Sequence, residues 1–169
     1  MTITIRAEAL ADLELIREVH LAAFPDATEA DLVDRLRSEA SSYLGLVAEI
    51  DGTVAGHLCM TEVTIENDGE NRKGLGIAPM GVLPPYQTKG LGSRLVTAAL
   101  DLAREKGVEF VVVLGEPDYY QRFGFRLAAP AVRWRSEEYD PYFQWIVLGG
   151  EHAGSLRGIA RYHRAIEAL

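Results

Sequence analysis

A glycine-rich turn leads directly into an amphipathic helix near the middle of the chain, and this junction restricts the fold more than any other segment. Residues 81–107 read GVLPPYQTKGLGSRLVTAALDLAREKG, so Gly90 and Gly92 stand where the helix begins. Glycine inside a helix costs about 1 kcal/mol relative to alanine. A helix N-terminus has unpaired N–H groups and binds phosphate oxygens where its backbone can be approached closely. The glycines therefore predict a pyrophosphate-binding loop with Gln87 and Lys89 as further donors; a simple chain reversal is the alternative.

The segments before this loop predict two helices and three strands. Residues 2–8 alternate like a strand, and Asp12 is placed to cap a helix that Pro25 ends. A T-x-x-D pattern predicts that Thr28 caps a second helix. Asp51-Gly52 predicts the turn of a hairpin within residues 43–67.

The strand that precedes the glycines is interrupted, whereas the strand that follows their helix is not. Pro79 and Gly81 break the apolar run over residues 74–84, and they predict a kink because proline donates no ladder hydrogen bond. Residues 108–117 (VEFVVVLGEP) contain a continuous apolar run typical of a strand buried on both faces. A short helix over residues 118–122 and further strands complete a mixed α/β fold, in the order β-α-α-β-β-β-α-β-α-β-β. We expect one domain over residues 1–169.

Composition excludes several classes of protein. The formal net charge of −8 argues against a nucleic-acid surface, which requires a basic face. No run approaches the roughly 20 apolar residues of a membrane helix, and the first residues do not resemble a signal peptide. The single cysteine, Cys59, rules out an intramolecular disulfide. These observations predict a cytoplasmic protein with no nucleic-acid or membrane partner.

Two familiar phosphate motifs are absent. Lys89 precedes Gly90 instead of following a glycine, so the G-x-x-x-x-G-K-[ST] loop is not present. Leu95 occupies the third glycine position of G-x-G-x-x-G, which excludes the dinucleotide fingerprint. His20, His152 and His163 share no metal-ligand spacing, so we expect no metal site.

The residues from Val82 to Gly92 match V-x-P-x-x-Q-x-x-G-x-G, and they resemble the acetyl-CoA signature of the GNAT superfamily of N-acetyltransferases. The segment YYQRFGF resembles the Y-x-x-x-G-F of the same family, with Tyr120, Gly124 and Phe125 in the matching places. The element order agrees from Thr2 to about Phe125. The resemblance implies a central mixed, largely antiparallel sheet with splayed strands flanked by helices.

The resemblance also implies a site for acetyl-CoA, where residues 77–83 and residues 110–114 splay apart. Pro79 and Gly81 are the physical reason that this chain can splay there. Free backbone groups around Val82 and Leu83 would pair with the pantetheine, and the amides of residues 88–93 would hold the pyrophosphate. The expected cofactor-binding residues are Met80, Gly81, Val82, Leu83, Gln87, Thr88, Lys89, Gly90, Leu91, Gly92 and Ser93.

The implied chemistry is direct attack of an amine on the thioester while both substrates are bound. A backbone N–H near Val82 would stabilise the oxyanion, and Tyr120 is the candidate that protonates or hydrogen-bonds the leaving sulfur. Many family members place a glutamate in the kinked strand, but residues 76–83 (GIAPMGVL) contain no acid. The general base stays open between Glu62, Glu116, a water chain and His57, which a strand position also explains as a structural histidine.

The amine acceptor is expected on two loops. Phe24 lies in the connection between the first two helices, and Glu137, Glu138 and Tyr139 combine acid with an aromatic ring that suits an ammonium group. We expect a small-molecule or protein amine as acceptor and a monomer or homodimer. A non-catalytic module that binds or senses acyl-CoA is the alternative, and a generic phosphate-binding α/β domain is a third reading.

Overall fold

The computed structural model describes residues 1–150 and 154–169, which form two compact units. Unit 1 contains Met1–Met60 and Ala78–Asp101, and unit 2 contains Thr61–Ile77 and Leu102–Leu169. Strands β3 (Thr53–Asn67) and β4 (Glu70–Val82) pass through both units, as does the helix α3 (Leu91–Glu105).

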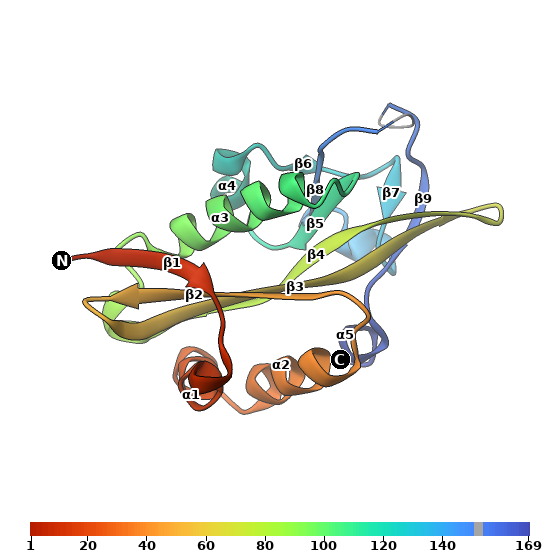
Figure 1. The fold of residues 1–169 in the computed structure, drawn as a ribbon. Helices are drawn as coiled ribbons and strands as arrows, with labels where there is room; N and C mark the ends of the chain where they lie inside the picture. The colour runs from red at the N-terminus through yellow and green to blue at the C-terminus, as the bar shows by residue number, and fades with distance from the viewer. Residues whose placement is uncertain (151–153) are drawn as a thin grey trace. The chain divides into compact units, whose positions relative to one another are not determined.

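Unit 1 is a layer of strands in the order β1-β2-β3-β4 with helices on both faces (Figure 1). β1 pairs antiparallel with β2, from Ile3↔Ile50 to Ala7↔Leu46. The helices α1 and α2 cover one face, and the start of α3 covers the other (Figure 1). The remaining elements of the unit are β1 (Ile3–Ala7), η1 (Leu10–Asp12), α1 (Leu13–Ala23), α2 (Thr28–Glu39), β2 (Tyr43–Ile50) and η2 (Pro84–Tyr86).

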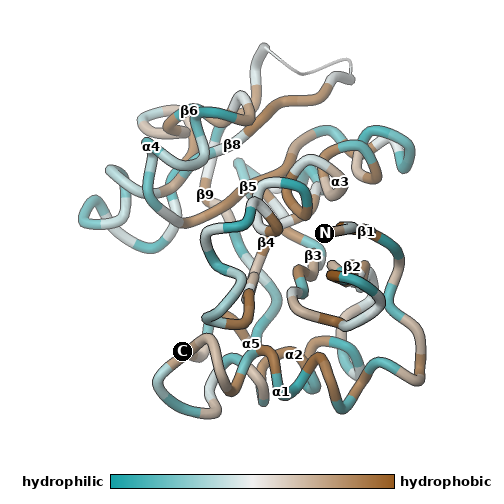
Figure 2. Tube along the Cα trace, turned by 90° about the vertical axis from the view of Figure 1, so that its left-hand side faces the viewer, coloured by the Kyte–Doolittle hydropathy of each residue, from teal (hydrophilic) through white to brown (hydrophobic). Residues whose placement is uncertain are grey.

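The helices of unit 1 contribute one apolar face each to its core. Each helix carries hydrophobic and hydrophilic residues in alternation along its tube (Figure 2), as expected when one face packs on a sheet. The inward residues of α3 are fully or almost fully buried: Leu95, Val96, Ala99 and Leu100. The hairpin turn is also confirmed, since Asp51 and Gly52 have positive φ values of 49° and 84°.

Asp12 occupies the N-cap position of α1 and Thr28 begins α2, as predicted, but neither side chain makes the capping hydrogen bond. Asp12 precedes α1 but makes no capping hydrogen bond to it; its carboxylate accepts the Ala9 N–H at 2.7 Å and pairs with Arg6. Thr28 is the first residue of α2, and Asp26 Oδ1 accepts its N–H at 2.9 Å. A capping pattern in sequence does not decide between neighbouring acceptors, because the path of the preceding loop selects which oxygen reaches the free N–H groups.

Unit 2 contains a mixed sheet with the strand order β3-β4-β5-β8-β6, and β9 and β7 extend it beyond β3. β4 and β5 are parallel over Leu75↔Val111, Gly76↔Val112 and Ile77↔Val113, and this three-pair ladder ends there although β4 runs on to Val82. The other elements are β5 (Phe110–Leu114), α4 (Pro117–Tyr120), η3 (Gln121–Phe123), β6 (Arg126–Leu127), β7 (Val132–Arg133), η4 (Glu137–Tyr139), β8 (Phe143–Val147), β9 (Gly158–Arg161) and α5 (Arg164–Glu167).

The expected mixed α/β fold with an open sheet flanked by helices is confirmed. The end of the chain differs in detail, because α5 is a helix where the sequence analysis predicts mostly strand. His163 causes this ending, since its ring accepts the Ala165 N–H at 3.0 Å and so caps the helix. The expectation of a single domain over residues 1–169 stays a prediction.

Candidate active site

The glycine-rich loop lies exposed between η2 and α3, in unit 1. The Tyr86 N–H donates to the Leu83 carbonyl at 2.9 Å, and the Lys89 N–H donates to the Tyr86 carbonyl at 3.1 Å. The chain then turns at Gly90, whose carbonyl accepts the Arg94 N–H at 3.2 Å at the start of α3. The fifteen-residue helix therefore begins at an open, solvent-accessible turn.

Gly90 has a physical reason to be glycine. Its φ is +85°, a conformation that costs an L-residue about 1–2 kcal/mol. A Cβ at this position would meet no atom within 4 Å, so the space beside the backbone is open. The turn needs glycine, and the same glycine leaves the approach to the helix N-terminus clear. A role of Gly90 in reversing the chain is therefore compatible with a role in phosphate binding.

Gln87 joins the loop to the end of β4. Its Nε2 donates to the Val82 carbonyl at 3.0 Å, and the Leu83 N–H donates to the Ala55 carbonyl on β3 at 2.8 Å. These two backbone groups therefore have partners within the chain, so they are not the free groups expected for pantetheine. The difference has two physical reasons: the Gln87 amide reaches back to the strand instead of toward a phosphate, and Leu83 pairs with the neighbouring strand β3.

The other expected cofactor-binding residues lie on the same stretch of unit 1. Met80 is half-buried on β4, Gly81 is buried, and Thr88 and Lys89 are exposed in the loop. Leu91 is buried at the start of α3, where it anchors the helix. Their contact with a cofactor stays a prediction.

Tyr120 ends α4, in unit 2. Its ring packs edge-on against Phe125 at 5.7 Å and against Tyr119 at 4.9 Å. Gly115 makes room for the ring, because a Cβ there would overlap it. Burial, and next to it the neighbouring Tyr119, raises the pKa of Tyr120 to about 12. The phenol is therefore protonated at neutral pH and able to donate a hydrogen bond.

The expected acceptor-binding residues fall into separate parts of the chain. Glu137, Glu138 and Tyr139 form η4 in unit 2; Tyr139 packs on Trp134 at 4.8 Å, and Glu137 pairs with Arg133 at 3.6 Å. Phe24 follows α1 in unit 1 and is half-buried. Whether these residues contact an acceptor stays a prediction.

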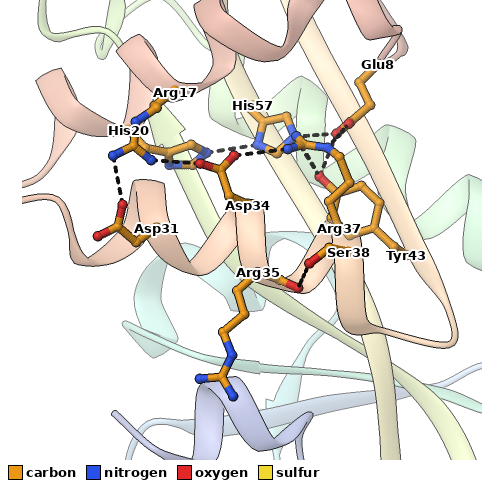
Figure 3. A network of polar contacts seen from close by, with 10 residues as sticks. All are labelled: Glu8, Arg17, His20, Asp31, Asp34, Arg35, Arg37, Ser38, Tyr43 and His57. Carbon is orange, nitrogen blue, oxygen red and sulfur yellow. Dashed lines mark hydrogen bonds and ion pairs between the residues drawn. The ribbon is translucent and has the colours of Figure 1, made fainter.

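Unit 1 contains a buried hydrogen-bond chain whose members were not predicted to contact one another. Figure 3 shows Glu8, His57 and His20 in a row. Glu8 Oε1 lies 2.8 Å from His57 Nε2, and His57 Nδ1 lies 2.9 Å from His20 Nε2. Tyr43 donates its hydroxyl to Glu8 Oε1 at 2.6 Å, and Arg37 Nε donates to Glu8 Oε2 at 2.7 Å.

The charges of this chain follow from burial and hydrogen bonding. Burial disfavours the charged form of Glu8, but hydrogen bonds from His57, Arg37 and Tyr43 outweigh it and lower the pKa to about 2. Burial lowers the pKa of His20 to about 3, with the charges of His57 and Arg37 acting in the same direction. Burial also lowers the pKa of His57, against the opposing hydrogen bond with Glu8. At neutral pH a carboxylate therefore faces two neutral imidazoles.

One signal in the sequence could have identified this chain. His20 follows Ile16 and Val19 on the inward face of α1, and a histidine in such a stripe needs a polar partner. Its partner cannot be read from the sequence, because His57 and Glu8 are distant along the chain. Of the other base candidates, Glu116 is exposed at the start of α4, and Glu62 is half-buried on β3.

The described residues contain neither a metal-ligating cluster nor a membrane-spanning helix. Within residues 1–150 and 154–169, no cluster of three histidine, cysteine or acidic side chains is placed to hold a metal ion; His152 lies outside these residues. In the same part of the chain, no helix has the length and apolar character needed to span a membrane. Cys59 is buried and unpaired as a thiol, and its Sγ donates to the Ala78 carbonyl at 3.2 Å.

Comparison with known proteins places the chain among acetyltransferases. Residues 10–125 match the model of the acetyltransferase (GNAT) family. "Uncharacterized N-acetyltransferase YhbS" of Escherichia coli K12 is 36% identical over 163 residues, which cover 94% of this chain and 95% of that protein. "Uncharacterized N-acetyltransferase YjhQ" of the same organism is 36% identical over 121 residues, which cover 70% of this chain and 67% of that protein.

Solved structures agree with the sequence matches. The crystal structure of Escherichia coli YhbS in complex with CoA has a TM-score of 0.88 at 34% identity, covering 98% of this chain and 92% of that chain. A GNAT family acetyltransferase from Brucella melitensis in complex with acetyl-CoA has a TM-score of 0.78 at 33% identity, covering 98% of both chains. Family model, sequence and fold converge on the resemblance found at the glycine-rich loop, and the chain belongs to the GNAT family of acetyltransferases.

Proposed function

We propose that this protein transfers the acetyl group of acetyl-CoA to an amine of a small molecule or a protein. The observation that carries the proposal is the open turn at Gly90 in front of the long helix α3. Family membership supports it, as do the CoA and acetyl-CoA complexes of two relatives with 33–34% identity.

The residues of unit 1 suit the phosphate end of such a substrate. The backbone from Thr88 to Ser93 would hold the diphosphate at the positive end of α3, with Lys89 supplying a cation. Met80 and Gly81 would line the pantetheine arm. Gln87 supports the loop instead of binding phosphate through the hydrogen bond that it already makes to Val82.

The reaction requires a neutral amine, a hydrogen-bond donor that stabilises the oxyanion, and a second donor for the leaving sulfur. Acetyl-CoA supplies an activated acyl carbon; the amine attacks it directly, without an acetylated enzyme. We assign the interaction with the leaving sulfur to Tyr120. Because its pKa of about 12 exceeds the roughly 8.5 of an ordinary thiol, full proton transfer to the thiolate is uphill, and Tyr120 acts mainly as a hydrogen-bond donor.

A ligand-induced thermal shift and a thiol-release assay test the proposal. Saturating acetyl-CoA should raise the melting temperature, since a ligand at about 100 times its Kd adds about 2.7 kcal/mol. Release of free CoA thiol should then depend on an amine from a panel of small amines and lysine peptides. Binding without thiol release from any amine would favour the non-catalytic acyl-CoA module instead.

A matched pair of glycine variants locates the binding site. Gly90→Ala and Gly52→Ala place a Cβ at nearly equal positive φ, +85° and +84°, with open space beside both. Both should therefore lose similar stability, about 1–2 kcal/mol. Only Gly90→Ala should lose acetyl-CoA affinity, measured by calorimetry, and equal affinities of the two variants would contradict the assigned loop.

A further inference from the structure

The hydrogen-bond chain Glu8–His57–His20 takes no part in the proposed binding of acetyl-CoA, yet its polar groups are buried and closely hydrogen-bonded. The side chains of both histidines are fully buried, and Glu8 is bound by three donors. Gly45 makes room for the carboxylate, because a Cβ there would overlap Glu8. Burying polar groups is costly unless every one of them is hydrogen-bonded.

One nitrogen of the Glu8–His57–His20 hydrogen-bond chain has no hydrogen-bond partner. His20 Nδ1 is buried, and no hydrogen bond reaches it from any residue that the structure describes. It faces Gly81 on β4: a Cβ built on Gly81 would lie 2.9 Å from it. The chain of hydrogen bonds therefore ends in a free nitrogen aimed at the stretch of β4 that we assign to the pantetheine arm.

The hydrogen-bond chain determines which nitrogens carry protons. Glu8 is a carboxylate and only accepts, so His57 Nε2 must donate to it. The neutral His57 ring then has a lone pair on Nδ1, which must accept from His20 Nε2. Neutral His20 therefore carries a lone pair on Nδ1. The free nitrogen is a proton acceptor.

We propose that His20 Nδ1 accepts the proton of the attacking amine through a water, and that Glu8 and His57 hold it in the accepting tautomer. This role rests on the proposed acetyl transfer. It supplies the base that the acid-free stretch of residues 76–83 lacks. Phe24, half-buried, lies parallel to the His20 ring at 6.0 Å, and the expected acceptor loop therefore borders the ring.

The step balances in bonds and protons. The amine lone pair forms the nitrogen–carbon bond, and the electrons of the carbon–sulfur bond leave on the thiolate. The surplus proton on nitrogen passes to His20 Nδ1 while the proton on His20 Nε2 passes to His57 Nδ1. The positive charge thus reaches His57, beside the Glu8 carboxylate, and returns to solvent as a proton after the product leaves.

Burial has the largest effect on the pKa of His57 and lowers it, whereas the hydrogen bond with Glu8 and the nearby negative charges act in the opposite direction. Glu8 follows β1 and Asp12 belongs to η1, and both negative charges favour a proton on His57; Arg37 on α2 opposes it. Tyr43 on β2 and Cys59 on β3 remain neutral, because burial raises the pKa of both. The two carboxylates outnumber the one guanidinium, so the nearby charges oppose the effect of burial on a proton at His57.

Two variants separate the proton-accepting role from a structural one. His20→Gln keeps a donor for His57 but has no basic nitrogen, and we expect a loss in kcat of about 100-fold or more with acetyl-CoA binding retained. Glu8→Gln replaces the acceptor-only carboxylate by an amide that can donate to His57 Nε2. That donation would invert both tautomers and place a proton on His20 Nδ1; tautomer inversion in catalytic triads costs about 10⁴ in kcat.

Nitrogen-15 NMR of the four histidines reads the tautomers without any activity assay. Wild-type His20 should be protonated at Nε2 only, and Glu8→Gln should convert it to the Nδ1–H form. His163→Asn, which keeps a good N-cap for α5, identifies one ring signal and should retain full activity.

The outcomes are distinct. A wild-type His20 with Nδ1–H, or a His20→Gln variant that is as active as the wild type, would overturn the proton-accepting role alone. A wild-type protein that binds acetyl-CoA but acetylates no amine would overturn the proposed function, and the role of His20 with it.

Discussion

The neighbours of Tyr120 determine the position and the protonation state of its phenol. Gly115 opens the space under its ring, and Phe125 fixes the ring edge-on. These contacts orient a phenol that burial keeps protonated, with a pKa of about 12. The motif around Tyr120 was legible in the sequence, whereas the part played by Gly115 emerges only from the packing.

Replacing Tyr120 by phenylalanine should therefore affect the chemical step and not binding. We expect Tyr120→Phe to lower kcat by about 100-fold or more, because the departing sulfur loses its donor, while acetyl-CoA affinity changes little. Steady-state kinetics and calorimetry measure the two effects separately. Tyr119→Phe removes the adjacent hydroxyl and is the matched control; an equal loss in both variants would assign the effect to ring packing.

Elements differ in how far the sequence predicts them. The helix α3 follows from its apolar spacing, because its apolar residues recur at helical intervals and those positions are buried. The caps of α1 and α2 do not, since Asp26 displaces Thr28 as the local acceptor. The helix α5 also escapes prediction, as four residues carry too little periodic signal.

The acidic element η4 is the candidate that attracts a cationic acceptor. The side chain of Glu137 is 83% exposed, so its pairing with Arg133 contributes little stability. We expect Glu137→Lys combined with Glu138→Lys to raise KM severalfold for cationic amines, more strongly at low salt, because the local field reverses sign. Glu70→Lys, an exposed reversal on β4, is the control. An unchanged KM for every cationic acceptor would count against η4.

At the scale of the whole molecule, local patterns predict the family but not the buried polar chain. The glycine-rich loop is contiguous, so residues 82–92 identify it without a structure. Glu8, His57 and His20 lie on different elements, separated by 37 and 49 residues, and become neighbours only when α1 packs on the sheet. From the sequence, His57 is only one of several base candidates and its contacts with Glu8 and His20 are not visible, so no single base is favoured.

This buried chain should also make the folded state sensitive to acid. His20 has a pKa of about 3 in the fold against an ordinary 6.5, so in this range the unfolded chain binds more protons. Stability therefore falls as pH drops below about 6.5, by about 1.4 kcal/mol per pH unit for each proton. The lowered pKa of His57 acts in the same direction. Glu8 contributes only later, as pH falls from 4.5 toward about 2.

Urea unfolding of the wild type and His20→Gln between pH 4.5 and 7 measures this term before Glu8 begins to titrate. The unfolding free energy of the variant should rise less steeply with pH than that of the wild type. The variant lacks a histidine that is neutral in the folded state but binds a proton in the unfolded chain over this pH range. His163→Asn controls for the loss of a histidine from the unfolded chain. Equal slopes for the wild type and His20→Gln would mean that the His20 ring is not held neutral by the fold.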